Sequence, residues 1–371
     1  MRMVIAGGGT GGHVIPALAV VEELRHREID LNVLWIGSER GLERSAATGL
    51  GIPFRAIPTG KLRRYIDVQT ILEVPRIPLG ILAAWRILRS FHPDVVFSTG
   101  GFVSVPTVLA AAKLAPILTH EQTSMMGLAN RINARFADVL AVSYSSTIEL
   151  AHGHPNIVLT GNPIRASLHT GIAERAMARF GFSPALPLIY VTGGARGASP
   201  LNHRIGELLP GILDMCQVLH QTGPASANDD AARLEALRAT WPEDLQSRYQ
   251  PVEYIGDELA DVYAAASLVV GRAGAGTVAE LAALGKPAIL IPLPGAASDE
   301  QTSNARVLAN NGAALLIPQI EASSARLCKT LRELIAAPDR LVSMAAAARV
   351  LAHPDAAALL GTALLRLAQA A

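Results

Sequence analysis

The chain has 371 residues, half of them hydrophobic, and a formal net charge of +1 at pH 7. This length is typical of two domains, and the near-balanced charge argues against a nucleic-acid-binding protein, which would be strongly basic. Cys216 and Cys328 cannot form a disulfide framework, so we expect reduced thiols. An apolar run begins within three residues of the N-terminus, and no stretch reaches about 18 uncharged apolar residues, which argues against a signal peptide and a membrane span.

Short apolar runs alternate with helical patterns along the chain, and the alternation restarts after the turn-like sequence GNPIR (Gly161–Arg165). Buried strands separated by helices predict parallel sheets covered on both faces. We therefore expect an α/β fold of two Rossmann-like, doubly wound domains facing each other across a cleft, with ligands beyond the carboxyl ends of the strands. The expected strands are Met3–Ala6, Asn32–Ile36, Phe54–Ile57, Asp94–Ser98, Pro116–Thr119, Val139–Val142 and Ile157–Leu159, then Leu188–Thr192, Cys216–His220, Gln250–Tyr254, Leu268–Val270, Ala288–Ile291 and Ala313–Leu316.

A glycine-rich turn, GGGTGGH (Gly7–His13), joins the first expected strand to a helix over Val14–Leu24. Backbone N–H groups at a helix N-terminus bind anions, so the expected ligand is a phosphate. The turn also fits the dinucleotide fingerprint, but that reading needs an acidic residue at the end of the second strand. Ile36 and Gly37 stand there, so NAD is disfavoured.

The same strand–glycine–helix form recurs at Ser98–Pro106, Val191–Ser199 and Val270–Glu280. Each turn alone could simply be a tight β–α connection. Four of them at the ends of parallel strands favour a site for a phosphate-bearing ligand.

Three polar side chains are candidates for chemistry at these turns. Glu280 could accept hydrogen bonds from both hydroxyls of a ribose, or it could be a glutamate favoured by the helix dipole. Arg165 could pair with a diphosphate, or it could be a surface arginine. His13 could be a general base, or it could cap the helix or bind a phosphate.

Seven sequence blocks together resemble the MurG family of peptidoglycan N-acetylglucosaminyltransferases, essentially from end to end. They are GGTGGH (Gly8–His13), GGFVSVP (Gly100–Pro106), HEQ (His120–Gln122), GNPIR (Gly161–Arg165), GGARGA (Gly193–Ala198), RAGAGTVAE (Arg272–Glu280) and DEQTSNA (Asp299–Ala305).

The resemblance implies the two-domain glycosyltransferase B fold without a metal or other cofactor. It implies transfer of GlcNAc from UDP-GlcNAc to the 4-hydroxyl of MurNAc in undecaprenyl-pyrophosphoryl-MurNAc-pentapeptide (lipid I), with inversion to a β-1,4 link. It also implies a peripheral protein on the cytoplasmic face of the plasma membrane, with cell-wall and division proteins as possible partners. Residues 1–162, completed by a C-terminal helix over 355–371, would bind the acceptor, and residues 163–354 would bind UDP-GlcNAc.

The family's functional residues map onto this chain as follows. His13 would be the general base, and the acceptor diphosphate would lie on Gly9, Gly12, His13, Gly100 and Gly101. The donor would contact Thr10, Gly11, Gly12, Thr123, Arg165, Ala195, Ile255 (through its backbone, at the uracil edge), Ala275, Gly276, Thr277, Glu280 (at the ribose), Gln301 and Asn304.

The chain departs from the family pattern at three of these positions. Thr123 replaces an asparagine expected near the transferred sugar, Ala195 replaces a serine, and Glu300 replaces a histidine. The backbone N–H of Ala195 remains, so that change should be mild. The other two leave the detailed contacts to the sugar and the acceptor open.

The stretch Val74–Asp94 is apolar on more than one helical face, with Pro78 expected to open the helix. Ile77, Ile81, Trp85 and Leu88 share one expected face, whereas Leu79, Leu82 and Phe91 lie off it. The basic residues Lys61, Arg63, Arg64, Arg76, Arg86 and Arg89 flank the stretch against Asp67 and Glu73. We expect a docking patch for anionic lipid made of Ile77, Leu79, Leu82, Trp85, Arg86 and Arg89; the alternative is a buried helix with a basic rim.

Two other classes of function remain open from the sequence. The first is a related enzyme, either a glycosyltransferase with a soluble acceptor or a UDP-GlcNAc epimerase, although no clear pair of acidic residues for epimerisation is visible. The second is a nucleotide-sugar-binding protein without catalysis, against which His13, Arg165 and Glu280 argue.

Overall fold

The computed structural model describes all residues except 40, 61–74, 152, 297–298 and 371. The chain forms two compact units, and each is described here by itself. The first unit comprises Met1–Arg165 and His353–Ala371, and the second comprises Ala166–Ala352. The unit boundaries thus lie a few residues from the expected ones at 162 and 354.

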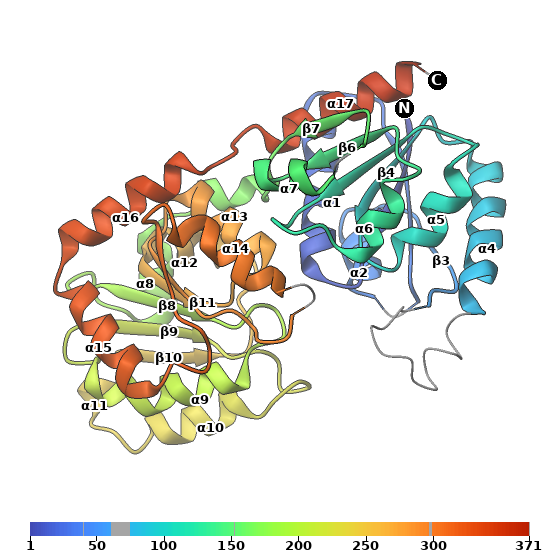
Figure 1. Cartoon of the computed structure of the whole chain (residues 1–371). Coiled ribbons are helices and arrows are strands. Elements are labelled where there is room, and N and C mark those ends of the chain that lie inside the picture. Colours follow the sequence, from blue (N-terminus) through green and yellow to red (C-terminus); the bar gives the residue numbers. More distant parts are fainter. Residues whose placement is uncertain (40, 61–74, 152, 297–298, 371) are drawn as a thin grey trace. The chain divides into compact units, whose positions relative to one another are not determined.

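A seven-stranded parallel sheet forms the centre of the first unit (Figure 1), in the order β3-β2-β1-β4-β5-β6-β7. Every neighbouring pair of strands is parallel. The strands are β1 (Arg2–Gly7), β2 (Asn32–Gly37), β3 (Phe54–Ala56), β4 (Val95–Gly100), β5 (Ile117–Glu121), β6 (Val139–Val142) and β7 (Ile157–Leu159).

Alternate residues of β1 face different helices of this unit. Because both faces of the sheet are covered, the strands of the unit are continuous apolar runs. Met3 and Ile5 pack with α1 and with α17, whereas Val4 and Ala6 pack with α4 and α5. The helices are α1 (Gly11–His26), α2 (Leu42–Gly49), α4 (Arg76–Phe91), α5 (Ser104–Ala111), α6 (Leu128–Asn133), α7 (Ser145–Leu150) and α17 (Ala356–Ala370).

The second unit contains a six-stranded parallel sheet in the order β10-β9-β8-β11-β12-β13. Its strands are β8 (Leu188–Thr192), β9 (Gln217–Gln221), β10 (Tyr249–Val252), β11 (Ala266–Gly271), β12 (Ala288–Leu290) and β13 (Ala314–Leu316). Its helices are η1 (Ala166–Thr170), α8 (Ala173–Phe180), α9 (Ser199–Leu208), η2 (Leu209–Gly211), α10 (Asp230–Arg238), α11 (Glu243–Gln246), α12 (Leu259–Ala265), α13 (Ala275–Leu284), α14 (Glu300–Ala309), α15 (Ser324–Ile335) and α16 (Pro338–Val350).

The expected fold class is confirmed, since both units are α/β with parallel sheets and each expected strand overlaps an observed one. The first helix begins at Gly11 rather than Val14, so the last glycines of the first turn already belong to α1. Among the described residues, none of the helices combines the length and apolar character that crossing a bilayer requires.

Candidate active site

Each of the four glycine turns follows the third or fourth strand in the order of its sheet. In the first unit they follow the neighbouring strands β1 and β4, and in the second unit the neighbouring strands β8 and β11. These pairs are the points where the strand order reverses. In doubly wound sheets, ligands bind at this position, beyond the carboxyl ends of the strands.

The two turns of the first unit touch each other through Gly101 and His13. Gly101 has φ +78°, and a Cβ there would lie 2.5 Å from the Gly8 carbonyl oxygen and 3.2 Å from His13 Nδ1. Only glycine fits such a close approach. The structure therefore brings Gly9, Gly12 and His13 of one turn together with Gly100 and Gly101 of the other.

The imidazole of His13 is positioned by its own turn. His13 is the third residue of α1, and its Nδ1 lies 2.9 Å from the Thr10 hydroxyl. In the tautomer whose Nδ1–H donates to the Thr10 hydroxyl, Nε2 is the atom that can accept a proton. The amide N–H groups of Gly11 and Gly12, at the start of the helix, have no hydrogen-bond acceptor among the described residues and can bind an anion.

Desolvation by the surrounding turns lowers the pKa of His13 from 6.5 to about 4, although the Gly8 carbonyl and the Glu43 carboxylate act in the opposite direction. The ring is consequently neutral at pH 7 in the unliganded protein, which is the form required of a base. An anion bound on the adjacent N–H groups would raise this pKa.

A buried carboxylate, that of Glu43, forms a hydrogen bond with the first glycine turn. We did not predict this role from the sequence. Glu43 lies in the first turn of α2 and is fully buried. It accepts hydrogen bonds from the Gly9 N–H (3.0 Å), the Ser38 N–H (2.8 Å) and the Ser38 hydroxyl (2.6 Å). The signal available in the sequence was its place after the second strand, near where a dinucleotide fold carries its acid.

The HEQ motif holds loops of the first unit in place. His120 lies 3.0 Å from the Gly161 carbonyl, and Gln122 donates to the Thr99 carbonyl at the start of the second glycine turn (2.7 Å). Glu121 accepts from the Thr123 N–H (3.0 Å) and from Asn130 (3.0 Å). Burial lowers the pKa of His120 to about 4 and raises the pKa of Glu121.

Thr123, at the position of the family's asparagine, turns its hydroxyl inward. The hydroxyl lies 2.7 Å from a Glu121 carboxylate oxygen and also contacts the Met125 carbonyl. This side chain is therefore engaged within the protein in the unliganded structure.

Arg165 is the last residue of the first unit before the chain enters η1. Its Nε is buried and has no hydrogen-bond partner among the described residues. Gly161, four residues earlier, has φ +80° and packs directly against His353 of the same unit.

The Gly193–Ala198 turn of the second unit leads into α9 and exposes its backbone. Gly197 has φ +73°, and a Cβ there would clash with the Thr222 carbonyl at 1.9 Å. Ala195 and Arg196 are exposed, and no described residue accepts from their amide N–H groups. These groups can bind a phosphate.

Gln221, at the end of β9, connects this turn to Ile255. Its Nε2 donates to the Gly194 carbonyl (3.1 Å), and its Oε1 accepts from the Ile255 N–H (3.2 Å). The Ile255 N–H is thus used within the protein, which leaves the carbonyl as the group available to a base edge. The role of Gln221 was not predicted from the sequence.

Glu280 lies on α13, whose first residues are Ala275, Gly276 and Thr277. It is buried, and its Oε2 accepts a hydrogen bond from the Tyr263 hydroxyl (2.8 Å). This contact fixes the orientation of the carboxylate, as a ribose-binding acid requires.

The last candidates, Gln301 and Asn304, lie on α14. Gln301 accepts from the Leu293 N–H (2.9 Å), and the buried Asn304 donates to the Ala273 carbonyl in the fourth glycine turn (3.3 Å). Arg272 in the same turn donates to the Ile291 and Pro292 carbonyls. In the unliganded structure these side chains fix the turn that would surround the sugar.

The helix of the expected docking patch differs in two details from the prediction. Helix α4 begins at Arg76, so Pro78 lies inside its first turn, where a missing N–H costs nothing. Trp85 is 38% exposed and lies with Leu79 (58%) and Leu82 (44%) on the solvent face, whereas Leu88 is buried. Trp85 lies at the border of the two faces, since it is about 60° around the helix from both the exposed Leu82 and the buried Leu88.

Basic side chains accompany the exposed apolar face of α4. Arg86 and Arg89 are exposed, and the Arg89 guanidinium lies over the Trp85 ring at 4.9 Å. The other flanking charges that we expected, Lys61, Arg63, Arg64, Asp67 and Glu73, lie outside the described residues.

The candidate residues divide between the units. The first unit carries Thr10, Gly11, Thr123 and Arg165 with the base and acceptor residues; the second carries Ala195, Ile255, Glu280, Gln301, Asn304 and the start of α13. Within the described part of the chain, no group of three or more His, Cys, Asp and Glu side chains could hold a metal ion.

Comparisons with known proteins give consistent matches. The glycosyltransferase family 28 N-terminal domain matches residues 3–142, and the glycosyltransferase family 28 C-terminal domain matches residues 188–360. Relatives from Treponema denticola and Listeria monocytogenes are each 38% identical, covering 94% and 98% of this chain and 93% and 99% of their own. Both carry the name UDP-N-acetylglucosamine–N-acetylmuramyl-(pentapeptide) pyrophosphoryl-undecaprenol N-acetylglucosamine transferase.

Solved structures agree with these matches. The crystal structure of MurG from Acinetobacter baumannii has a TM-score of 0.75 and 28% identity, covering 98% of this chain and 99% of that chain. A UDP-GlcNAc 2-epimerase from Neisseria meningitidis has a TM-score of 0.69 at 15% identity, with 99% and 100% coverage, and shows the shared fold alone.

Proposed function

The chain belongs to the MurG family of family 28 glycosyltransferases, and on that premise we propose that it transfers GlcNAc from UDP-GlcNAc to the 4-hydroxyl of MurNAc in lipid I, giving lipid II for peptidoglycan synthesis. The chain is therefore a hexosyltransferase; its donor, its acceptor and the β-1,4 stereochemistry are the proposal. The observation that carries it is the match to named GlcNAc transferases over nearly the whole chain.

In this proposal the second unit binds the donor. Glu280, oriented by Tyr263, accepts hydrogen bonds from the ribose hydroxyls, and the Ile255 carbonyl accepts from the uracil edge. The exposed N–H groups of the Gly193–Ala198 turn bind the diphosphate. Arg165, which belongs to the first unit, is proposed as a further diphosphate ligand through the family resemblance alone. Gln301, Asn304 and the start of α13 surround the GlcNAc.

The first unit binds the acceptor diphosphate on the paired glycine turns beside His13. Inversion requires the MurNAc hydroxyl to attack the anomeric carbon from the side opposite UDP. The new C–O bond forms as the bond from the anomeric carbon to the diphosphate oxygen breaks. His13 Nε2 accepts the hydroxyl proton, which contributes about 10²–10⁴-fold to the rate.

Negative charge develops on the departing UDP, and an enzyme of this kind must stabilise it. Backbone N–H groups and the α9 dipole are fixed before the reaction, so they stabilise this charge without reorganisation, and in this proposal an arginine adds a positive charge. We propose that these groups suffice and that the reaction is independent of metal ions.

We further propose that the protein acts at the cytoplasmic face of the plasma membrane as a peripheral protein. The exposed leucines and arginines of α4 support binding to anionic lipid, where each basic residue contributes about 1 kcal/mol. Cell-wall and division proteins are candidate partners through the family alone.

A direct assay tests the function. Incubation of the protein with UDP-GlcNAc and a short-chain lipid I analogue should release UDP and yield a β-1,4-linked disaccharide. Hydrolysis of UDP-GlcNAc without a disaccharide, or no turnover at all, would contradict the proposal.

A further inference from the structure

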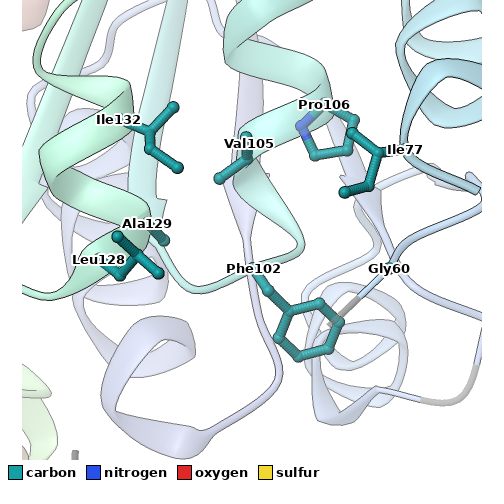
Figure 2. Close-up of a pocket in the computed structure, with 8 residues that line it drawn as sticks. All are labelled: Gly60, Ile77, Phe102, Val105, Pro106, Leu128, Ala129 and Ile132. Atoms are coloured by element: carbon teal, nitrogen blue, oxygen red, sulfur yellow. The ribbon is translucent and has the colours of Figure 1, made fainter. Parts of the chain in front are cut away.

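The first unit contains an apolar pocket of about 170 Å³ beside the acceptor turns (Figure 2). Ile77 from the start of α4, Phe102 from the second glycine turn, Pro106 from α5 and Ile132 from α6 contribute to its wall. None of the described residues that line it has a polar side chain. The wall is mostly apolar, so the pocket favours an apolar group over a sugar, a peptide or a phosphate.

One side of this pocket adjoins the expected phosphate-binding backbone. Phe102 directly follows Gly101, and its ring packs on the first turn, where a Cβ at Gly9 would lie 3.2 Å from Phe102 Cε1. Gly101 in turn contacts His13. A group in the pocket therefore lies next to a ligand held on the two glycine turns.

The other side of the pocket continues into exposed apolar surface. Leu128, at the start of α6, lines the pocket and is 58% exposed. Ile77 belongs to α4, two residues before the exposed Leu79. An apolar chain that leaves the pocket in this direction would contact the apolar side chains of Leu128 and Leu79.

The volume limits how much of such a chain can enter. An apolar cavity of roughly 150 Å³ accommodates benzene, which has six carbons, and one isoprene unit has five. We propose that this pocket binds the isoprene unit that is joined to the acceptor diphosphate. The inference rests on the proposed function, since it takes a prenyl diphosphate as the acceptor's anchor, and it adds a subsite for the first apolar unit of the chain.

Acceptor analogues with different esters on the diphosphate test the pocket in the full-length protein. The KM for a MurNAc-pentapeptide diphosphate should be about tenfold lower with a dimethylallyl ester than with a methyl ester, because a few methylene groups become buried. Ala129→Leu, which fills the pocket, should raise the dimethylallyl KM to the methyl value. The methyl KM, the UDP-GlcNAc KM and kcat should not change, which also shows that the variant is folded.

Two further variants keep the test independent of one substitution. Leu128→Gln places an amide in the wall at an exposed position and should also remove the preference for the dimethylallyl ester. Leu114→Gln is the matched control, because Leu114 is exposed in the same unit but does not line the pocket. It should leave the ratio of the two KM values as in the wild type. An unchanged ratio in both pocket variants would overturn the assignment.

A binding measurement separates failure of the pocket from failure of the proposed function. If the wild type transfers GlcNAc to neither ester, the proposed function fails. Calorimetry with inorganic diphosphate and dimethylallyl diphosphate still tests the pocket: about tenfold tighter binding of the prenyl compound, lost in Ala129→Leu, would support it. Equal affinity for the two compounds would refute it.

Discussion

The glycine turns that begin α1 and α9 look alike in the sequence, but opposite chemical groups support them. In the first unit the buried Glu43 carboxylate accepts the Gly9 N–H. In the second unit the neutral Gln221 amide donates to the Gly194 carbonyl. The negative charge of a carboxylate next to a turn weakens the binding of an anion there. A neutral amide does not weaken the attraction of the helix dipole and the outward N–H groups for an anion.

This difference suggests separate tasks for the two turns. In the proposed reaction, the first turn holds a histidine beside a ligand whose charge does not change. The second turn would face a diphosphate whose negative charge grows as the sugar leaves, which is where fixed N–H groups contribute most.

Removing the ring of His13 should have the largest effect. His13→Ala should lower kcat by about 10²–10⁴-fold, because it removes the proposed proton acceptor, while UDP binding stays normal. Thr10→Ala is the matched control: it removes only the contact to Nδ1 and should cost less. Wild-type kcat at saturating acceptor with a raised acceptor KM would make His13 a phosphate ligand rather than the base.

Glu280→Ala should weaken the donor site alone. The loss of hydrogen bonds to a carboxylate costs about 1.5–3 kcal/mol, so the KM for UDP-GlcNAc should rise about 10- to 150-fold. The acceptor KM should not change. Tyr263→Phe removes the orienting hydroxyl and should have a smaller effect of the same kind. Unchanged UDP affinity by calorimetry would remove Glu280 from the site.

A buried histidine in the second unit should make stability depend on pH. His220 is fully buried between the Tyr249 hydroxyl and the Asn202 carbonyl oxygen, and burial lowers its pKa from 6.5 to about 3. Below pH 6.5 the unfolded chain binds a proton that the folded protein excludes. The free energy of unfolding should therefore fall with decreasing pH, between 6.5 and 3, by at most about 1.4 kcal/mol per pH unit from this residue.

Urea unfolding at several pH values measures this contribution. His220→Gln keeps a donor and an acceptor in place and should show a shallower pH dependence than the wild type. His169→Gln, at an exposed position of the same unit, should match the wild type. If the free energy of unfolding changed with pH equally in His220→Gln and the wild type, His220 would contribute nothing to the pH dependence, which would contradict the lowered pKa.

The exposed face of α4 should control binding to lipid and not the chemistry. Leu79→Glu with Leu82→Glu should reduce sedimentation with anionic vesicles on the order of tenfold, since two apolar side chains become charged. Activity should fall with a long-chain acceptor but not with a short-chain one. Ile320→Glu with Val350→Glu adds the same charge at exposed sites of the second unit and should change neither. Unaltered sedimentation of the α4 variant would exclude this face from membrane binding.

Much of the fold and part of the site could be predicted from the sequence because they depend on local pattern. Strands β1 and β8 are continuous apolar runs, and each glycine turn is visible as a gap between such a run and a helical pattern. The resemblance to a family then supplied roles for His13 and Glu280. Neither the strands and turns nor these two roles required knowledge of contacts between residues distant along the chain.

The supporting groups could not be predicted because they depend on tertiary contacts. Glu43 reads as an ordinary glutamate in the first turn of a helix, and only the packing of α2 brings its carboxylate to Gly9. Gln221 reads as one residue of a strand, although it joins two loops. Trp85 was assigned to the wrong face because its angle around the helix is nearly midway between two apolar rows.

Chelation of metal ions should have the smallest effect, and it tests the comparison most directly. If the Gly193–Ala198 turn and Arg165 stabilise the charge on departing UDP, they do what a divalent cation does in other transferases. Activity should then survive EDTA unchanged, and added Mg²⁺ should not stimulate it. Gly197→Ala, which would force the turn away from the Thr222 carbonyl, should lower kcat whether or not Mg²⁺ is present. Loss of activity in EDTA with recovery on adding Mg²⁺ or Mn²⁺ would show that the N–H groups are insufficient, and the contrast drawn between the two turns would then fail.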